Sequence, residues 1–200
     1  MSHATNLVTG DVNGGSDVFL RDNILNTTTL VSRDSLWAQL NSWVNSVVGV
    51  SDDANYVYFN SIDNNITSGD IYGTIDMFVR NISLGTTTHV AKSYTGADIF
   101  GIFGSPSLTS DGTRVLFNST SNVIVTWDTN GLMDTFMYDA VSGITTRVSV
   151  GNTGAEANAY NVIHFSNSLS KNGRFVGFVS IADNLVLWDT NVLADVFIRD

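Results

Sequence analysis

Short stretches of alternating apolar and polar residues, most of them four to six residues long, run through the chain and predict β-strands. One of these stretches begins Asp-x-Phe and recurs four times, starting at Asp17, Asp76, Asp134 and Asp195. The spacings between the copies are 59, 58 and 61 residues. A nearly constant period of this length is typical of tandem repeats in which each copy is one supersecondary unit.

Three further segments recur with the same step. An apolar segment before Asp-x-Phe carries Phe59, Phe117 and Phe178, and a Thr-rich segment follows it at 27–32, 86–91 and 145–150. A fourth segment, 105–110, is joined to the Phe117 segment by Asp-Gly, a dipeptide that favours a β-hairpin. Each repeat is therefore predicted to contain four antiparallel strands, here A to D in chain order, with the three Phe residues buried at equivalent positions of strand B.

One window departs from the strand pattern. Between residues 35 and 47, Leu36, Leu40, Trp43 and Val47 are spaced as on one face of a helix. We interpret this window as a decorated loop between two repeats.

The repeat resembles that of a known family. The matching motifs are Ser-Asp-Gly-x-x-Val-x-Phe at 110–117, Asp-Thr-Asn-Gly-x-x-Asp-x-Phe at 128–136, Gly-x-Thr-Thr-Arg-Val-Ser at 143–149, and the segment 184–200. Together they resemble the bacterial TolB-like β-propeller repeat, which is distantly similar to WD-type blades. The resemblance covers nearly the whole chain and implies an all-β fold, a β-propeller-type tandem repeat of four-stranded antiparallel blades. Such propellers serve as protein-binding scaffolds, extracellular repeats and, less often, enzyme domains, so it does not fix an activity.

The predicted strands read CD, ABCD, ABCD, ABC, which is about three and a fraction copies. The predicted units are a partial blade at 1–32, blades at 33–91 and 92–150, and a partial blade at 151–200. A propeller ring typically has four to eight blades. Two explanations stay open: the chain is an excerpt of a longer propeller, or its incomplete end blades are completed by neighbouring copies.

The net charge of the chain argues against one class of partner, nucleic acids. The chain has 19 acidic and 9 basic residues among 200, a net charge of -10, and only 14% of its residues are charged. Asn, Ser, Thr and Gly must therefore cover much of the surface. A net negative charge repels phosphate groups, so we expect no nucleic-acid partner. No apolar run approaches the roughly 20 residues of a membrane helix, so no membrane insertion is predicted.

The loop before each Asp-x-Phe segment is the main candidate for chemistry. Two carboxylates and an amide oxygen around a tight turn are oxygen ligands that calcium prefers. Alternatively, the same side chains cap their own turns and have a structural role only. We favour the structural role because the ligands are fewer than in an EF-hand loop, and because Tyr72 and Val192 replace loop Asn and Gly residues. The candidate calcium ligands are Asp11, Asn13, Asp17, Asp128, Asn130, Asp134, Asp189, Asn191 and Asp195.

Trp127 and Trp188 directly precede the loop Asp, where the first two repeats have Gly10 and Gly69. Exposed rings at this position could stack on sugar rings or bases, but we favour packing between neighbouring blades or subunits.

No catalytic constellation is evident. His3, His89 and His164 share neither a ligand spacing nor a repeat position, and no Gly-x-Ser-x-Gly motif is present. The chain is therefore predicted not to be an enzyme.

Two functional hypotheses follow. The first is a non-catalytic secreted or surface β-propeller module, extracellular, on the cell surface or periplasmic, which acts in self-assembly, adhesion or protein binding, with a protein or carbohydrate as the possible ligand. It associates with itself through its incomplete end blades, so that residues 1–32 contact residues 166–200 of a neighbour. The alternative is a fragment of a larger ligand-binding or enzymatic propeller whose active residues lie in missing blades.

Overall fold

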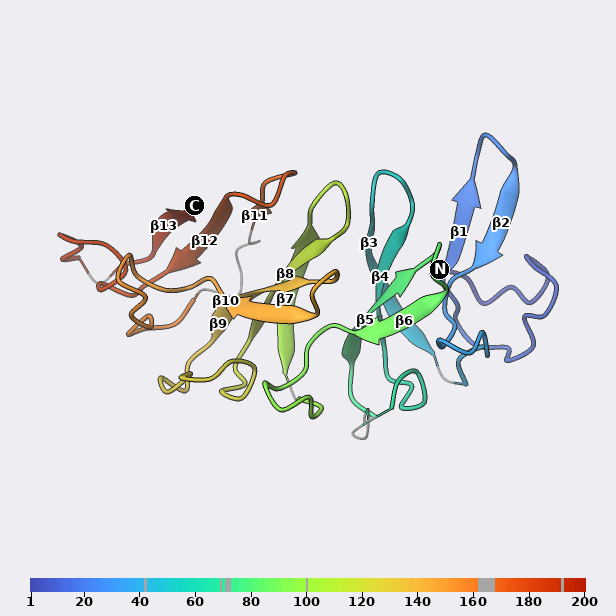
Figure 1. Cartoon of the computed structure of the whole chain (residues 1–200), viewed down its shortest axis with the longest axis horizontal. Helices are drawn as coiled ribbons and strands as arrows, with labels where there is room; N and C mark the ends of the chain where they lie inside the picture. The colour runs from blue at the N-terminus through green and yellow to red at the C-terminus, as the bar shows by residue number, and fades with distance from the viewer. Residues whose placement is uncertain (42, 69, 71–72, 100, 162–167, 192) are drawn as a thin grey trace. The chain divides into compact units, whose positions relative to one another are not determined.

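The computed structural model describes residues 1–200 except 42, 69, 71–72, 100, 162–167 and 192. The described residues form thirteen β-strands and no helix (Figure 1), which confirms the all-β prediction. No helix long and apolar enough to cross a membrane occurs among them. The chain divides into two compact units, Met1–Val90 and Ala91–Asp200.

The first unit contains two antiparallel sheets. The first sheet pairs β1 (Phe19–Asp22) with β2 (Thr27–Leu30). The second sheet has the order β3, β4, β5, β6 and is formed by β3 (Val44–Val50), β4 (Tyr56–Ser61), β5 (Asp76–Asn81) and β6 (Thr86–His89). Strands that follow one another in the chain are therefore neighbours in the sheet.

The second unit also contains two antiparallel sheets, in which strands that follow one another in the chain are neighbours. The third sheet has the order β7, β8, β9, β10 and is formed by β7 (Ile102–Leu108), β8 (Arg114–Ser119), β9 (Asp134–Asp139) and β10 (Ile144–Arg147). The fourth sheet has the order β11, β12, β13 and is formed by β11 (Ser168–Leu169), β12 (Val176–Ser180) and β13 (Asp195–Arg199).

A pair of phenylalanines marks the centre of three sheets. Phe59 lies opposite Phe78 across β4 and β5, and Phe178 lies opposite Phe197 across β12 and β13. Phe117 and Phe136 pair in the same way across β8 and β9. The stacked rings have centroids 5.7 to 5.9 Å apart. All three predicted strand-B phenylalanines are buried, as expected.

Each unit has an apolar core in which one sheet packs on the next. In the first unit, Val18, which directly precedes β1, and Leu20 of β1 pack in the cluster that contains Phe59 and Phe78. In the second unit, Leu116 of β8 and Met137 of β9 join the cluster around Phe178 and Phe197. Because side chains alternate along a strand, Leu20 and Met137 project from the face opposite to the Phe of their own strand. One face of each earlier sheet thus packs on the Phe pair of the later sheet.

The window at 35–47 is not one loop. Residues 44–47 belong to β3, where Val47 lies opposite Phe59, so the loop interpretation is wrong for this part. The preceding part is a turn, because the Asp34 carboxylate accepts hydrogen bonds from the backbone N–H groups of Leu36 and Ala38. The apolar spacing that resembled a helix therefore combines a turn with the start of a strand. The strand A predicted at 105–110 is also shifted, since β7 spans Ile102–Leu108.

The Phe pairs should be the principal source of stability. We expect Phe59→Ala to lower the free energy of unfolding by about 3–5 kcal/mol, because it removes a buried ring and leaves a cavity. Ile24→Ala is the matched control, since Ile24 is 94% exposed and should change stability by less than about 0.5 kcal/mol. Urea denaturation followed by circular dichroism measures both. Equal midpoints for the two variants would contradict the assignment of the core.

Candidate functional site: the acidic loops

Four acidic loops precede the Asp-x-Phe strands, and we number them in chain order: 11–17, 70–76, 128–134 and 189–195. In the first and third loops the last Asp is buried and accepts a short hydrogen bond from a serine fifteen residues later. Ser32 Oγ donates to Asp17 Oδ1 at 2.6 Å, and Ser149 Oγ donates to Asp134 Oδ1 at 2.5 Å. This bond fastens the start of strand C to the segment that follows strand D.

In the first loop, one glutamine side chain joins both carboxylates. Gln39 Nε2 donates to Asp11 Oδ1 at 2.8 Å and to Asp17 Oδ2 at 3.1 Å, while its Oε1 accepts from the Val12 N–H at 2.9 Å. Asn13 Oδ1 accepts from the Gly15 N–H, so the amide oxygen caps its own turn. Both carboxylates therefore have a neutral protein donor.

In the third loop, an arginine takes that place. Arg147 lies 3.2 Å from Asp128 Oδ1 and 3.4 Å from Asp134 Oδ2, and its Nη2 is 2.6 Å from Glu156 Oε1. Its guanidinium also donates to the carbonyl oxygen of Trp127 at 3.2 Å. One buried cation thus faces three carboxylates.

Burial and the neighbouring groups shift the pKa values of two acids in this cluster. Burial and the neighbouring Asp134 carboxylate raise the pKa of Asp128 to about 6, although Arg147 acts in the opposite direction. Burial also acts to raise the pKa of Glu156, but hydrogen bonds from Thr129 and Arg147 outweigh it and hold that pKa below its usual value. Asp128 therefore holds its proton to a higher pH than an ordinary aspartate does.

Asn130 completes the third loop. Its Nδ2 donates to Asp134 Oδ2 and to the Ala157 carbonyl oxygen, each at 3.1 Å, and its Oδ1 accepts from the Leu132 N–H at 2.8 Å. As in the first loop, the amide oxygen of the loop asparagine is used by the turn itself.

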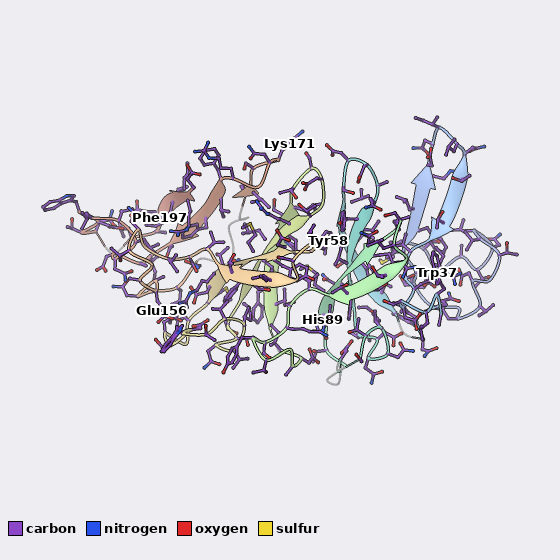
Figure 2. The ribbon with its side chains drawn as sticks, viewed as in Figure 1. Trp37, Tyr58, His89, Glu156, Lys171 and Phe197 are labelled. Carbon is purple, nitrogen blue, oxygen red and sulfur yellow. The ribbon has the colours of Figure 1, made fainter. Side chains whose placement is uncertain are left out.

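The second loop has a histidine in place of the arginine. His89 (Figure 2) is thirteen residues after Asp76, as Arg147 is after Asp134, and its Nε2 lies 3.4 Å from Asp76 Oδ1. Asp70 is also buried. Tyr72 lies outside the described residues.

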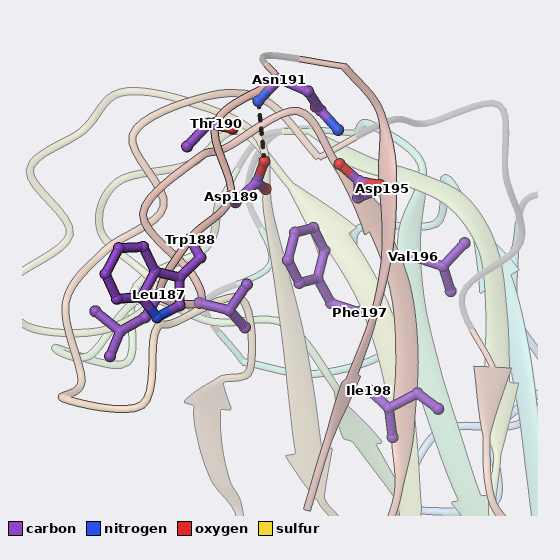
Figure 3. Close-up of a pocket in the computed structure, with 10 residues that line it drawn as sticks. Leu187, Trp188, Asp189, Thr190, Asn191, Asp195, Val196, Phe197 and Ile198 are labelled. Atoms are coloured by element: carbon purple, nitrogen blue, oxygen red, sulfur yellow. Dashed lines mark hydrogen bonds between the residues drawn. The ribbon is translucent and has the colours of Figure 1, made fainter.

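The fourth loop is open to solvent (Figure 3). Asp189, Asn191 and Asp195 line a pocket of about 430 Å³ together with Trp188 and Phe197. The Asn191 N–H donates to Asp189 Oδ1 at 3.5 Å, and Asn191 Oδ1 accepts from the Leu193 N–H. Val192 and His164 lie outside the described residues.

These contacts bear on the calcium hypothesis. In the first and third loops, N–H groups of Gln39, Asn130 and Arg147 point at the oxygens that a calcium ion would require. A calcium ion would have to displace these donors, so the geometry of both loops favours the structural interpretation. Calcium binding at the loops stays a prediction.

The side chains that surround the loop acids were missed by sequence reasoning. Gln39 and Glu156 lie 22 residues after the last Asp of their loops, and His89 and Arg147 lie 13 residues after it. Counting from the loop Asp would have aligned these positions, but their chemical identity changes from repeat to repeat and leaves no motif.

The two loop tryptophans are exposed by 84% at Trp127 and 93% at Trp188, so packing of these rings between blades of the same chain is wrong. Both have positive φ, 71° and 74°, as does Gly10 with 88° at the equivalent position. A left-handed conformation disfavours residues with a Cβ, which explains the glycine of the first repeat. Stacking on a sugar ring and packing against another subunit both stay predictions.

The raised pKa of Asp128 predicts a pH effect. The folded state holds this proton up to about pH 6, whereas the unfolded carboxyl loses it near 3.8. The wild type should therefore lose stability as the pH rises from about 4 to 6. Asp128→Asn cannot titrate, so its stability relative to wild type should be up to about 2 kcal/mol greater at pH 7 than at pH 4. Urea denaturation at both pH values measures this. The exposed Asp52→Asn should show no such difference, and the same behaviour of the two variants would refute the assignment.

Calcium gives a second prediction. If the loops have a structural role, millimolar calcium chloride should leave Tm unchanged. A rise in Tm that a chelator reverses would establish calcium binding by mass action. Asp189→Asn and Asp11→Asn would then show which loop is responsible.

The sequence matches no protein-family model and no curated protein. Solved structures do resemble the chain. TolB from Acinetobacter baumannii is 16% identical, with a TM-score of 0.45 over 92% of this chain and 35% of that one. Putative TolB from Agrobacterium tumefaciens is 17% identical, with a TM-score of 0.47 over 94% and 53%. One structure from a study of two prolyl endopeptidases is 13% identical, with a TM-score of 0.50 over 92% and 24%.

The chain thus spans between about a quarter and a half of the length of these structures. At such identities the likeness concerns the fold alone. Together with the recurring antiparallel sheets and the repeat motifs, the likeness at a TM-score of 0.50 supports a β-propeller-type fold.

Proposed function

We propose that the chain is a non-catalytic β-propeller module of a secreted or surface bacterial protein, and that it associates with itself head to tail. The observation that carries this proposal is an exposed apolar face on the fourth sheet. Val196 and Ile198 of β13 are 76% and 77% exposed. On the third sheet, Met137 of β9 holds the position equivalent to Ile198 and packs on the core around Phe178 and Phe197. The same face is therefore covered in one sheet and exposed in another.

The first sheet of a second copy has the surface that matches this face. The described packing places the outer face of one sheet on the Phe of the next sheet. Phe19 of β1 is the counterpart of Phe78 and Phe197, and it is only half-buried. Packing Val196 and Ile198 of one copy beside Phe19 of another would repeat this contact. Such a heterologous contact produces rings or filaments.

The remaining features support a binding role and an extracytoplasmic location. The chain has few charged residues and many Asn, Ser, Thr and Gly residues, which provide an uncharged polar surface. In the first and third loops the acids are engaged with serines or other protein donors, which supports a structural role for them. Trp127 and Trp188 offer exposed aromatic surface for a protein or carbohydrate ligand.

The alternative function is a part of a larger ligand-binding or enzymatic propeller. It is favoured by the limited span of the chain relative to the similar structures. In that case the exposed face of the fourth sheet would be covered by a further repeat of the same polypeptide.

Self-association is tested by sedimentation velocity across micromolar concentrations. The wild type should form species larger than a monomer, and the double variant Val196→Lys with Ile198→Lys should sediment as a monomer, because two charges on the face would lose hydration on packing. Val141→Lys is the matched control, since Val141 is an exposed turn residue between β9 and β10. A wild-type chain that stays a compact monomer would reject self-association and leave the alternative.

A further inference from the structure

We propose that the second acidic loop and the end of β6 bind a divalent transition-metal ion of the zinc type, with Asp76 and His89 as the central ligands and Asp70 as the third. This site differs from the calcium sites predicted at the other loops, because one of its ligands is an imidazole nitrogen. It uses no residue of the exposed face of the fourth sheet, so the proposal does not depend on self-association.

The second sheet brings Asp76 and His89 together. Asp76 is the first residue of β5, and His89 is the last residue of β6 (Figure 2). His89 lies opposite Phe78, which projects from the same face of β5 as Asp76 because side chains alternate along a strand. The imidazole packs against the Phe78 ring, with centroids 5.0 Å apart. Asp76 and His89 are both 2% exposed, so the pair is shielded from solvent.

The distance between the two polar groups fits a shared metal ion. Thr74 Oγ1 donates to Asp76 Oδ2 at 3.2 Å, and the other oxygen, Oδ1, lies 3.4 Å from His89 Nε2. A charge-assisted N–H···O bond is typically about 2.7–2.9 Å long, so this contact is long for such a bond. Two atoms that each bind a tetrahedral zinc ion at about 2.0–2.1 Å are about 3.3 Å apart. The observed distance therefore agrees with two ligands of one ion.

The second repeat lacks the donors that satisfy the equivalent carboxylate in other repeats. In the first and third repeats, a serine fifteen residues after the last loop Asp donates to that Asp. The second repeat has Ala91 at this position, which carries no hydroxyl group. The position of Gln39, the amide donor of the first loop, is held in the sequence by Asp98. Because a buried carboxylate is costly without donors or a cation, Asp76 needs a different partner.

The third repeat shows which kind of partner the scaffold accepts. Arg147 lies thirteen residues after its last loop Asp, as His89 does, and its guanidinium contacts both loop carboxylates. In the second repeat the two loop carboxylates belong to Asp70 and Asp76, which are both buried. An imidazole is shorter than the arginine side chain and has no permanent charge. A metal ion bound by His89 would supply the positive charge that Arg147 supplies in the third repeat.

The kinds of ligand atom indicate which metal ion fits. Calcium and magnesium prefer oxygen ligands, whereas an imidazole nitrogen combined with carboxylate oxygens is typical of zinc and other divalent transition metals. Two carboxylates balance the double positive charge of such an ion, and a neutral imidazole adds no further charge. Three protein ligands leave one position of a tetrahedral ion for water.

Zinc chloride is the probe, added to the full chain without an affinity tag after treatment with a chelator and dialysis. Isothermal titration calorimetry at pH 7 measures the affinity and the number of ions bound. The wild type should bind one zinc ion at this site, and zinc should raise Tm by mass action. Calcium chloride at the same concentration should leave Tm unchanged.

Variants of the full chain locate the site. Asp76→Asn and His89→Gln should each weaken zinc binding about tenfold or more. His89→Arg reproduces the residue of the third repeat, so it should fold without zinc, and its Tm should not respond to zinc. This variant decides the question if circular dichroism shows that the other two do not fold. His3→Ala is the matched control, since it removes an exposed histidine and should bind zinc like the wild type.

Two results would overturn the proposal. The first is a wild-type Tm that does not change with zinc, in which case a protonated His89 would be the cation of the second loop. The second is wild-type zinc affinity in the folded His89→Arg variant, because the ion would then be bound elsewhere on the chain.

Discussion

The buried carboxylate at the start of the Asp-x-Phe strand is the constraint on which the first and third sheets depend. A carboxylate without solvent is tolerated only when donors surround it. Asp17 and Asp134 each receive a serine hydroxyl from beyond strand D, and each receives a second donor from another segment. To satisfy one side chain, the chain must bring strand C, strand D and the segment after strand D together. The Asp thus fixes the order of strands as well as its own loop.

The second donor differs between repeats, and this difference sets the electrostatics of each loop. In the first loop, a neutral amide donates hydrogen bonds to both acids. In the third loop, Arg147 must satisfy Asp128, Asp134 and Glu156 at once. Burial of Asp128 raises its pKa most, and the neighbouring carboxylates of Asp134 and Glu156 raise it further against the opposing effect of Arg147, so Asp128 retains a proton at a higher pH than an ordinary aspartate. The same loop scaffold therefore holds its acids with different partners in the first and third repeats.

The parts of the fold that depend on local pattern could be predicted from the sequence. Alternation and the Phe positions locate the strands, and the Phe rings are buried where the pattern places them. The loop acids could be named as well, but not their partners, because Gln39 and Glu156 come from the next repeat and share only their distance from the Asp. The interpretation of residues 35–47 as one loop was wrong for a related reason. A turn held by Asp34 and the start of β3 together produce an apolar spacing like that of a helix. Exposure of Trp127 depends on neighbours that a linear pattern does not specify.

Tandem repeats of similar sequence carry a hazard during folding, because a strand of one copy can pair with the body of another. The residue thirteen positions after the loop Asp is leucine in the first repeat, histidine in the second and arginine in the third. Each matches the donors or acids of its own loop and leaves a mismatch in the others: leucine would bring no donor to Asp128, and arginine would enter a first loop already served by Gln39. A strand exchanged between repeats would therefore place an unmatched side chain beside the loop acids, and this mismatch disfavours pairing in the wrong sheet.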